Sequence, residues 1–437
     1  MSGKMKLEVV ERKCIKPSTP TPSNLQSFKL SLLDQLAPNI HGNMTLFYPH
    51  NPTVDAHHFS TKSQLLQNTL SQILTLFYPL AGRLHDPATI LCNDQGAFFI
   101  ESRTDTSLSD ILTVPDFDTL QCLLPTADNQ TMTASNSSML LVRFTSFRCG
   151  GTALTISLTH KIVDIAALIT LLKAWTAACV GSTAPVLPEL TVGATLFPPR
   201  EIPGMSASVN TVSSAKFTTT RLVFHASKVE ELKNRVKTGF KASRVEVVLA
   251  LIWKCALGAS RSKTGSFKRS VLFQAVNLRP RMEPVVPDTA VGNFVWPFMV
   301  TVEKESDVEL EVMVRRMREG MREFVEKKAK KLKKEGAFGV VMESLKERAE
   351  VLKKDSISWV YKCSSWCKFP LLKTDFGWGE AVWMSSVNNM VSNTIALMDT
   401  NDGGVEAFVT LDHQHIPFFQ QHPHLLHYAL LNPPLII

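Results

Sequence analysis

His160 and Asp164 form an H-x-x-x-D group, the pair in this chain with the clearest capacity for acid–base chemistry. A neutral imidazole is the usual general base near neutral pH, because its pKa lies close to neutrality. On an ideal helix residues four apart share a face, so Asp164 could orient His160 as in a hydrolase triad. Such a group is common by chance, and the spacing alone leaves the role of the pair open.

Two predicted elements position His160. Residues 152–159 alternate between apolar and small polar side chains, which predicts a half-buried strand. Residues 166–175 are rich in helix formers with apolar residues about 3.6 apart, which predicts a helix. His160 therefore lies at a strand-to-helix junction, from which its side chain can project into a cleft. Helical spacing between His160 and Asp164 need not hold across such a junction.

A second group, Asp375-Phe376-Gly377-Trp378-Gly379, indicates a tight turn. Two glycines around a tryptophan suit backbone that is closely approached or takes positive φ. The group lacks the length and context of a phosphate loop. We interpret it as a packed turn in which Asp375 bonds nearby backbone or an arginine.

Other reactive side chains do not complete a site in the sequence. Cys363 and Cys367 are interpreted as packed thiols, and no G-x-S-x-G elbow of a serine hydrolase is present. Five histidines near the C-terminus have no cysteine or carboxylate cluster beside them, which favours a surface segment over a metal site. These are His413, His415, His422, His424 and His427.

Hydrophobic periodicity, together with proline, glycine and capping residues, predicts the remaining elements. Residues 17–22, rich in proline, indicate a stiff extended lead-in, and the globular part is expected to begin near residue 30. Residues 196–220, rich in Pro, Ser and Thr, indicate a linker. Further predictions are a helix over 63–77, a hairpin turn at 92–97 between two short strands, a strand at 221–224, a helix from an N-cap at Ser243 to about residue 259, and a buried strand at 271–277.

Length and composition restrict the class of protein. A chain of 437 residues with 44% apolar residues predicts a globular protein of two domains or one large bilobal unit. Its eight cysteines form no C-x-x-C pair, which favours reduced core thiols in a cytoplasmic protein. The charged N-terminus precedes no apolar stretch, and the sequence has no apolar run of about 18 residues, so neither a signal peptide nor a membrane span is expected.

The net charge of +8 is local. Residues 315–354 hold fourteen Lys and Arg against seven Glu, and the densest part is residues 327–334. The plainest interpretation is a solvated helix or surface segment. A second interpretation is that the run steers a phosphorylated cosubstrate toward a nearby opening. Nucleic-acid binding is not expected, because the run has no interleaved aromatic residues and no recognisable module.

The H-x-x-x-D and D-F-G-W-G groups, some 200 residues apart in one chain, resemble those of the plant BAHD family of acyl-CoA-dependent acyltransferases. Within that family the likeness is to the branch of vinorine synthase and related alkaloid and terpenoid acetyltransferases. Shorter matching segments extend the resemblance over essentially the whole chain. They include residues 15–22, 32–35, 77–83, 92–94, 274–279, 292–293, 365–367 and 403–407.

The resemblance implies a fold of two similar mixed α/β domains, like that of chloramphenicol acetyltransferase, with a solvent channel between them. The implied N-terminal domain spans residues 1–200 and is completed by residues near 373–397. Residues 201–220 would be a crossover linker, and residues 221–437 the C-terminal domain. CoA would reach the family histidine from one side of the channel and the acceptor from the other.

The resemblance also implies roles for individual residues. His160 would be the general base, and Asp164 would point away from the cleft to pair with Arg279 as a structural orienter. Asp375, Gly377, Trp378 and Gly379 would be structural support. Ser364 and Trp366 match positions that line the acyl site in the hydroxycinnamoyl branch, with Ser364 a candidate oxyanion donor. Ser243 is a candidate for contact with the CoA cosubstrate.

The implied reaction is transfer of an acyl group, acetyl by expectation, from a CoA thioester to a hydroxyl of an alkaloid or terpenoid. No covalent intermediate, permanent cofactor or metal is needed, because a thioester is already activated. The expected partners are acyl-CoA and a small alcohol, without nucleic acid or membrane, and the protein is expected to act as a monomer. One departure is Ile165, where the family usually has glycine, which leaves the acceptor preference open. N-acylation of an amine or polyamine, and a catalytically silent binding relative, are the alternatives.

Overall fold

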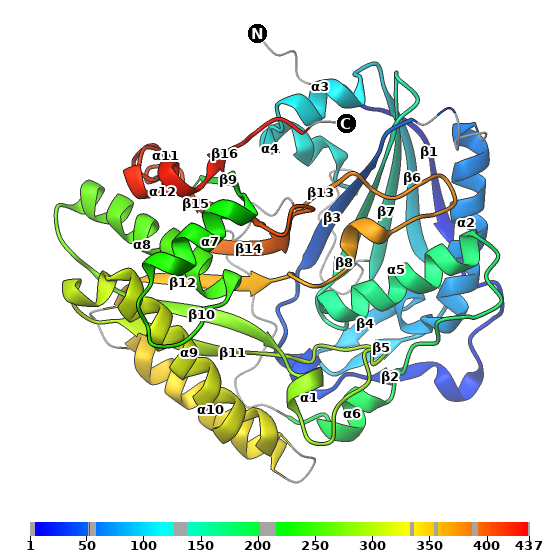
Figure 1. The fold of residues 1–437 in the computed structure, drawn as a ribbon. Coiled ribbons are helices and arrows are strands. Elements are labelled where there is room, and N and C mark those ends of the chain that lie inside the picture. Colours follow the sequence, from blue (N-terminus) through cyan, green and yellow to red (C-terminus); the bar gives the residue numbers. More distant parts are fainter. Residues whose placement is uncertain are drawn as a thin grey trace.

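The computed structural model describes residues 5–50, 52, 58–125, 138–201, 216–332, 336–353, 357–386 and 392–435. Its chain forms two halves, each built around a mixed sheet with helices packed on it (Figure 1). Two hydrophobic cores correspond to the two sheets, which is the two-layer arrangement expected when each sheet buries one face under helices.

The first sheet carries the strand that ends at His160. Its strand order is β1 (Glu8–Ile15), β6 (Ala97–Thr104), β7 (Leu140–Phe147), β8 (Thr152–Thr159), β3 (His41–Tyr48) and β13 (Trp383–Ser385). A small sheet of β2 (Ser27–Lys29), β5 (Thr89–Leu91) and β4 (Arg83–Asp86) lies beside it. The helices that pack on the first core are α2 (Phe59–Leu76), α3 (Leu108–Thr113), α4 (Phe117–Leu120) and α5 (Ile165–Cys179). Two short helices, α1 (Leu32–Leu36) and α6 (Val192–Leu196), pack against the second core instead.

The second sheet forms the other wall of the molecule. Its order is β11 (Val295–Val302), β10 (Arg269–Asn277), β12 (Ile357–Ser365), β14 (Thr394–Asp399), β15 (Val405–Asp412), β9 (Phe217–Phe224) and β16 (Leu430–Leu431). Its helices are α7 (Ala226–Arg235), α8 (Arg244–Thr264), α9 (Leu310–Lys327), α10 (Ala337–Lys353), α11 (Ile416–Gln420) and α12 (Pro423–Tyr428). The apolar helix α8 packs against α7, α9 and α11, which makes it the centre of this half.

Strand β13 comes from the C-terminal part of the chain but pairs with β3 of the first sheet. The Trp383 ring stacks on Phe47 with centroids 5.3 Å apart. The next strand, β14, returns to the second sheet between β12 and β15. The chain therefore crosses between the halves more than once. The domain boundaries drawn from the sequence stay a proposal.

Most predicted elements are present, and three predictions were wrong: the hairpin at 92–97, the start of the fold near residue 30 and the end of the linker. The strand at 152–159 and the helix after it are β8 and α5, and the helix from Ser243 is α8, which ends at Gly265 with φ +74°. The residues around 92–97 form no hairpin, because β5 and β6 belong to different sheets. The ordered fold begins at β1, before the proline-rich segment, since β1 pairs with β6. Strand β9 begins at Phe217, inside the predicted linker, whose residues 202–215 lie outside the described part of the chain.

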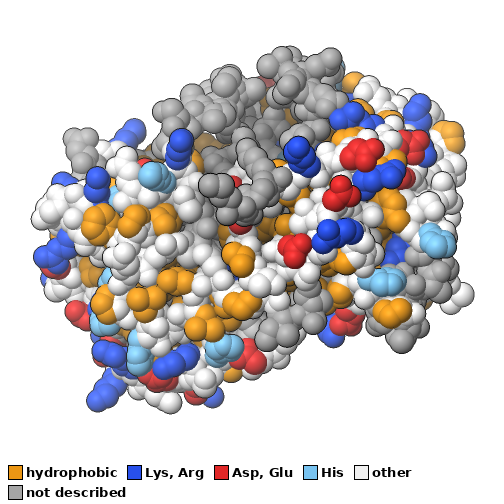
Figure 2. Space-filling view, turned by 90° about the horizontal axis from the view of Figure 1, so that it is seen from above, with side chains coloured by type: hydrophobic (Ala, Val, Ile, Leu, Met, Phe, Trp, Pro, Cys, Tyr) orange, Lys and Arg blue, Asp and Glu red, His pale blue; other side chains and the backbone are white. Residues whose placement is uncertain are grey.

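Three lysines in the densest part of the basic run form ion pairs. Lys327 contacts Glu323, Lys330 contacts Glu326, and Lys328 contacts Glu347 of α10. A different face, the one seen from above in Figure 2, also has cationic and anionic side chains interspersed. This pairing favours the plain interpretation of the run as a solvated helical surface. Residues 333–335 lie outside the described part.

Candidate active site

His160 follows the last residue of β8 and is held through its backbone and its ring. Its N–H donates to the Ile40 carbonyl at 2.8 Å. Its Nδ1 lies 3.0 Å from Oδ1 of Asn293, a residue just before β11 in the other half of the chain. The imidazole is thus fixed by contacts from both halves of the molecule.

The orientation of Asn293 decides which ring nitrogen of His160 is free. The Asn293 Nδ2 group donates to the His160 carbonyl at 2.8 Å and to Asp34 Oδ1 at 2.9 Å. Both acceptors need an N–H, so the amide oxygen faces the ring and accepts from Nδ1–H. The lone pair of the neutral imidazole then resides on Nε2. That tautomer is the one a general base at Nε2 requires.

Asp34 fixes Asn293 in turn. Its Oδ1 also accepts from the Asn293 backbone N–H at 2.7 Å, and its Oδ2 accepts from the Ser31 hydroxyl at 2.6 Å. Burial raises the pKa of the Asp34 carboxyl, against which the Ser31 and Asn293 hydrogen bonds act. Gly292 lies beside this carboxylate with φ +139°, a backbone conformation that strains any residue with a side chain, and a Cβ there would lie 3.3 Å from the Phe294 ring.

Lys161 ties the same loop to the end of α1. Its Nζ donates to the carbonyls of Gln35 at 2.9 Å and Ala37 at 2.8 Å. Burial lowers the pKa of Lys161, although the nearby Asp34 opposes the shift. The lysine after the histidine is therefore committed to holding the backbone.

Asp164 is bonded to the structure around it and not to the His160 ring. Arg279 binds it in a two-pronged contact, with Nη1 to Oδ2 at 2.7 Å and Nη2 to Oδ1 at 3.0 Å. The carboxylate also accepts from the N–H groups of Ala167 at 2.9 Å and Phe294 at 3.0 Å, the first as the N-cap of α5. Arg279 is fully buried and donates further to the Ala290 carbonyl. This geometry disfavours the triad arrangement of Asp164 with His160 and makes Asp164 a brace between the halves.

Two cavities meet at His160. One has a volume of about 670 Å³ and lies between α9, α10 and β11, and the other has about 770 Å³ and lies between β8, α5, β12 and β14. The shared lining residues show that the cavities adjoin around the imidazole. They are Pro38, His160, Phe273, Val295, Pro297 and Arg348.

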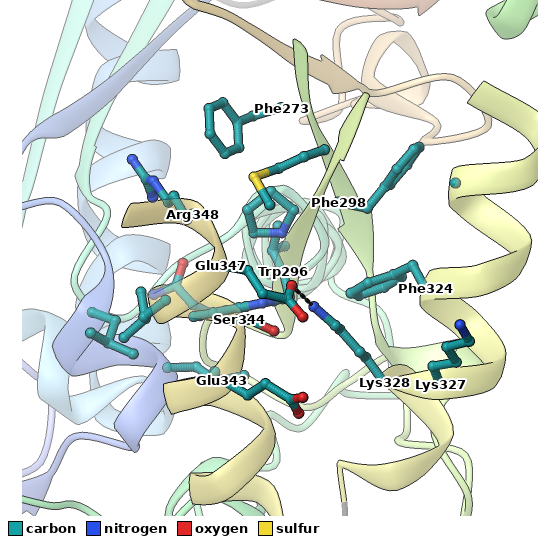
Figure 3. A pocket seen from close by; sticks show the side chains of 18 of the residues that line it. Phe273, Trp296, Phe298, Phe324, Lys327, Lys328, Glu343, Ser344, Glu347 and Arg348 are labelled. Carbon is teal, nitrogen blue, oxygen red and sulfur yellow. Dashed lines mark hydrogen bonds and ion pairs between the residues drawn. The ribbon is translucent and has the colours of Figure 1, made fainter. Parts of the chain in front are cut away.

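The smaller cavity carries the charged side chains of α9 and α10 at its rim. Figure 3 shows Lys328 turned to Glu347, with Lys327, the last residue of α9, beside it. Aromatic rings of Trp296, Phe298 and Phe324 line its inner part. Lys327, Lys328 and Lys331 line this cavity, and the first two are held by glutamates. Steering of a cosubstrate by the run stays a prediction.

Ser364 and Trp366 line the larger cavity at the end of β12. The Trp366 indole Nε1 donates to Ser364 Oγ at 3.0 Å. The indole N–H is thereby used, while the Ser364 hydroxyl hydrogen stays available for a ligand oxygen. Of the two candidate oxyanion donors at this end, the hydroxyl is the one that this geometry favours.

Ile165 also lines the larger cavity. It is the first residue of α5, directly after the N-cap Asp164, and Leu168 one turn later lines the same wall. Both are partly buried against the first core. The branched side chain that replaces the usual glycine therefore narrows a cavity that reaches His160.

The D-F-G-W-G turn and Ser243 lie outside the described linings of both cavities. Asp375 Oδ1 accepts from the N–H groups of Gly377 at 2.7 Å and Gly379 at 2.9 Å, and both glycines have positive φ. The Phe376 and Trp378 rings are buried and stack on each other with centroids 5.7 Å apart. Ser243 caps α8 by accepting from the Glu246 N–H at 3.2 Å. A contact of Ser243 with CoA stays a prediction.

Within the described residues, no group of three or more His, Cys, Asp or Glu side chains is placed to hold a metal ion. His427 contacts Glu231, and His422 lies 3.5 Å from the Cys255 sulfur, so these C-terminal histidines have protein partners. All eight cysteines are free thiols. None of the helices in the described ranges is long and apolar enough to span a membrane.

Sequence reasoning assigned no role to four residues at the site: Asp34, Asn293, Arg348 and Lys362. The first two lie 126 and 133 positions from His160, and only the fold brings them beside it. Arg348 lies within the basic run, where it could not be distinguished from its solvated neighbours. Lys362 lies between two buried residues of β12, Tyr361 and Cys363. A lysine between two apolar residues of a strand was the one signal in the sequence that could have singled it out.

Comparison with known proteins gives consistent matches over nearly the whole chain. The model of the Transferase family matches residues 5–426. Akuammiline synthase 1 of Alstonia scholaris is 35% identical over 97% of this chain and 98% of its own. Limonoid 1-O-acetyltransferase of Citrus sinensis is 33% identical over 99% of this chain and 100% of its own. Vinorine synthase of Rauvolfia serpentina is 34% identical over 93% of this chain and 94% of its own. The crystal structure of vinorine synthase has a TM-score of 0.82 at 32% identity, covering 94% of this chain and 96% of that one.

Proposed function

Because this chain belongs to the Transferase family of BAHD acyltransferases, we propose that it moves an acetyl group from acetyl-CoA to a hydroxyl of a plant alkaloid or terpenoid. One observation carries the proposal. His160 stands where two cavities meet, and the Asp34–Asn293 contacts favour the neutral tautomer whose lone pair is on Nε2. A base in that position can serve two substrates that arrive from different sides.

The first step is attack of the acceptor on the thioester. An alcohol is too weak an acid to ionise alone near neutral pH, so His160 Nε2 takes the hydroxyl proton as the oxygen bonds to the carbonyl carbon. General-base assistance of this kind contributes about 10²–10⁴-fold. The Nδ1–H group then donates to Asn293 Oδ1 from an imidazolium, which strengthens that hydrogen bond as charge develops.

The second step is collapse of the tetrahedral intermediate. The Ser364 hydroxyl is the proposed donor to its oxyanion, and the Trp366 N–H makes that hydroxyl a better donor by bonding to its oxygen. As the C–S bond breaks, the proton on Nε2 passes to the departing CoA sulfur, and the ester leaves. Arg279 and Asp164 take no part in proton transfer, but they keep the β8–α5 junction and the Asn293 loop together.

The larger cavity is the proposed acceptor site. Its described wall includes Met44, Leu158, Val163, Ile165 and Phe408, which suits a rigid apolar skeleton. Its volume of about 770 Å³ falls within the range usual for small-molecule sites. Cytoplasmic location and a monomeric state are further predictions from the sequence.

The test is release of free CoA from acetyl-CoA by purified protein offered hydroxylated alkaloids and terpenoids, with product mass measured in parallel. His160→Ala is expected to lower kcat about 10²–10⁴-fold. His413→Ala, in a described turn after β15 and outside both cavities, is the matched control. Unchanged turnover in His160→Ala would exclude the general-base role, and turnover of amines alone would redirect the assignment to N-acylation.

A further inference from the structure

Two cationic side chains from different elements line the larger cavity. They are Arg348 of α10 and Lys362 of β12, and Arg348 lines the smaller cavity as well. The Arg348 guanidinium carbon lies 4.9 Å from the centroid of the Phe273 ring, which belongs to the same wall. Partial burial lowers the pKa of Lys362 and the nearby Arg348 lowers it further, although both side chains reach solvent.

The carboxylates with described contacts near these cations bind other partners. Asp164 is the one acidic side chain in the described lining of the larger cavity, and its oxygens are bonded to Arg279, Ala167 and Phe294. Glu347, next to Arg348 in α10, contacts Lys328. Figure 3 shows Arg348 on the Phe273 side of the pocket, while Glu347 and Glu343 lie on the side of Lys328. The described residues thus leave two positive charges beside the proposed acceptor site without an ion pair.

A ligand carboxylate would offset this charge. Like charges that share a cavity with apolar walls disfavour each other, and an anion between them removes that cost. The planar guanidinium fork matches the two oxygens of a carboxylate, and a ring beneath the guanidinium limits the planes it can adopt. An ammonium group such as Lys362 can approach the same anion from the second side.

We propose that Arg348 and Lys362 form a carboxylate-recognition subsite for one of the two substrates. The proposal rests on the acyl-transfer function above and narrows its substrate class. The carboxylate belongs to an acidic hydroxylated terpenoid acceptor. The second source is the acyl group of a dicarboxylic donor such as malonyl-CoA, which would then replace the acetyl-CoA proposed above. A protonated amine is disfavoured, because the same two cations repel it.

Binding without turnover tests the acceptor source. Oleanolic acid, a hydroxylated triterpenoid acid, and its methyl ester are titrated into the protein by calorimetry in the absence of donor. Arg348→Gln and Lys362→Met are each expected to weaken binding of the acid about tenfold, because each removes a charge-assisted contact in a solvent-reached cavity. Binding of the ester is expected to stay unchanged. Lys346→Met, an exposed cation of α10 outside both linings, should alter neither ligand.

The donor source is tested by the same variants with malonyl-CoA and acetyl-CoA. If the donor carries the carboxylate, Arg348→Gln weakens malonyl-CoA about tenfold and leaves acetyl-CoA unchanged. The proposal is overturned if acid and ester respond alike and both thioesters weaken equally, since the cations would then bind the CoA phosphates. It is also overturned if the wild-type protein prefers neither carboxylate ligand to its neutral counterpart. Absence of CoA release with every acceptor would refute acyl transfer but would leave these binding results standing.

Discussion

Replacing Asn293 by alanine should slow the chemical step, because Asn293 lines the smaller cavity and contacts the His160 ring from there. In the ground state Asn293 Oδ1 accepts one hydrogen bond, at 3.0 Å, from a neutral ring. In the proposed transition state the ring is an imidazolium, so the same bond becomes charge-assisted, and only an interaction that strengthens in this way raises kcat. The change also removes the contact that selects the Nδ1–H tautomer.

The magnitude follows from the loss of one charge-assisted hydrogen bond. A value of about 1.5–3 kcal/mol corresponds to a fall of about 10- to 150-fold in kcat, with KM for both substrates nearly unchanged. The assay is steady-state CoA release over a range of pH. ¹⁵N NMR of histidine-labelled protein adds a direct readout, because the two tautomers have different ring-nitrogen shifts.

A matched variant separates this positioning role from a general loss of stability. Ser102→Ala removes a buried hydrogen bond at 2.9 Å to Thr145 in β6 and β7, away from both cavities. Ser102→Ala should lower the free energy of unfolding, as Asn293→Ala does, but it should leave kcat unchanged. The reasoning is refuted if Asn293→Ala retains more than half of the wild-type kcat, or if its tautomer signature matches that of the wild type.

Three further results are expected. Asp164→Ala leaves the buried Arg279 charge without its partner and should lower the free energy of unfolding, measured with urea, by about 3–5 kcal/mol. The double variant Asp164→Ala/Arg279→Met should regain part of this loss. A loss below about 1 kcal/mol in Asp164→Ala would contradict the bracing role. Ile165→Ala widens the larger cavity and should raise the kcat/KM ratio of bulky to small acceptors, whereas an unchanged ratio would remove Ile165 from the specificity wall. Burial lowers the pKa of His41, so the folded state binds fewer protons than the unfolded one below the ordinary value of 6.5, and stability falls as pH drops through that window. The thermal unfolding midpoint of His41→Gln should fall less steeply with decreasing pH than that of the wild type. Equal pH dependence of the two midpoints would contradict a stability contribution from the His41 pKa.

The local parts of this structure could be predicted because they depend on local physics. Alternation in residues 152–159 marked the strand, the serine at 243 marked a helix start, and two glycines marked the turn after Asp375. The hairpin prediction at 92–97 failed because turn-forming residues indicate where the chain bends. They do not indicate which strands pair after the bend. Residues Asp94 and Gly96 do take positive φ, but they lead the chain from one sheet to another.

The site was predictable only in part, for the same reason. His160 carries its own chemical signal, and the pairing of Asp164 with Arg279 was an expectation from family resemblance alone. The role of Asn293 depends on a backbone path that folds back over 133 positions, and Asp34 reaches it from 259 positions away. Arg348 stands out as a ligand-binding candidate only once the structure shows that Lys327, Lys328 and Lys330 are paired with glutamates.

The crossing of β13 into the first sheet has a consequence for biosynthesis. Until residue 385 has emerged from the ribosome, β3 presents an unpaired edge, and the Phe47 ring lacks the Trp383 ring that covers it. An open hydrophobic edge of this kind invites pairing with other chains. The N-terminal half is therefore expected to wait, incomplete, for most of translation, and a fragment that stops after residue 200 should accumulate in inclusion bodies unless the missing strand is supplied as a peptide.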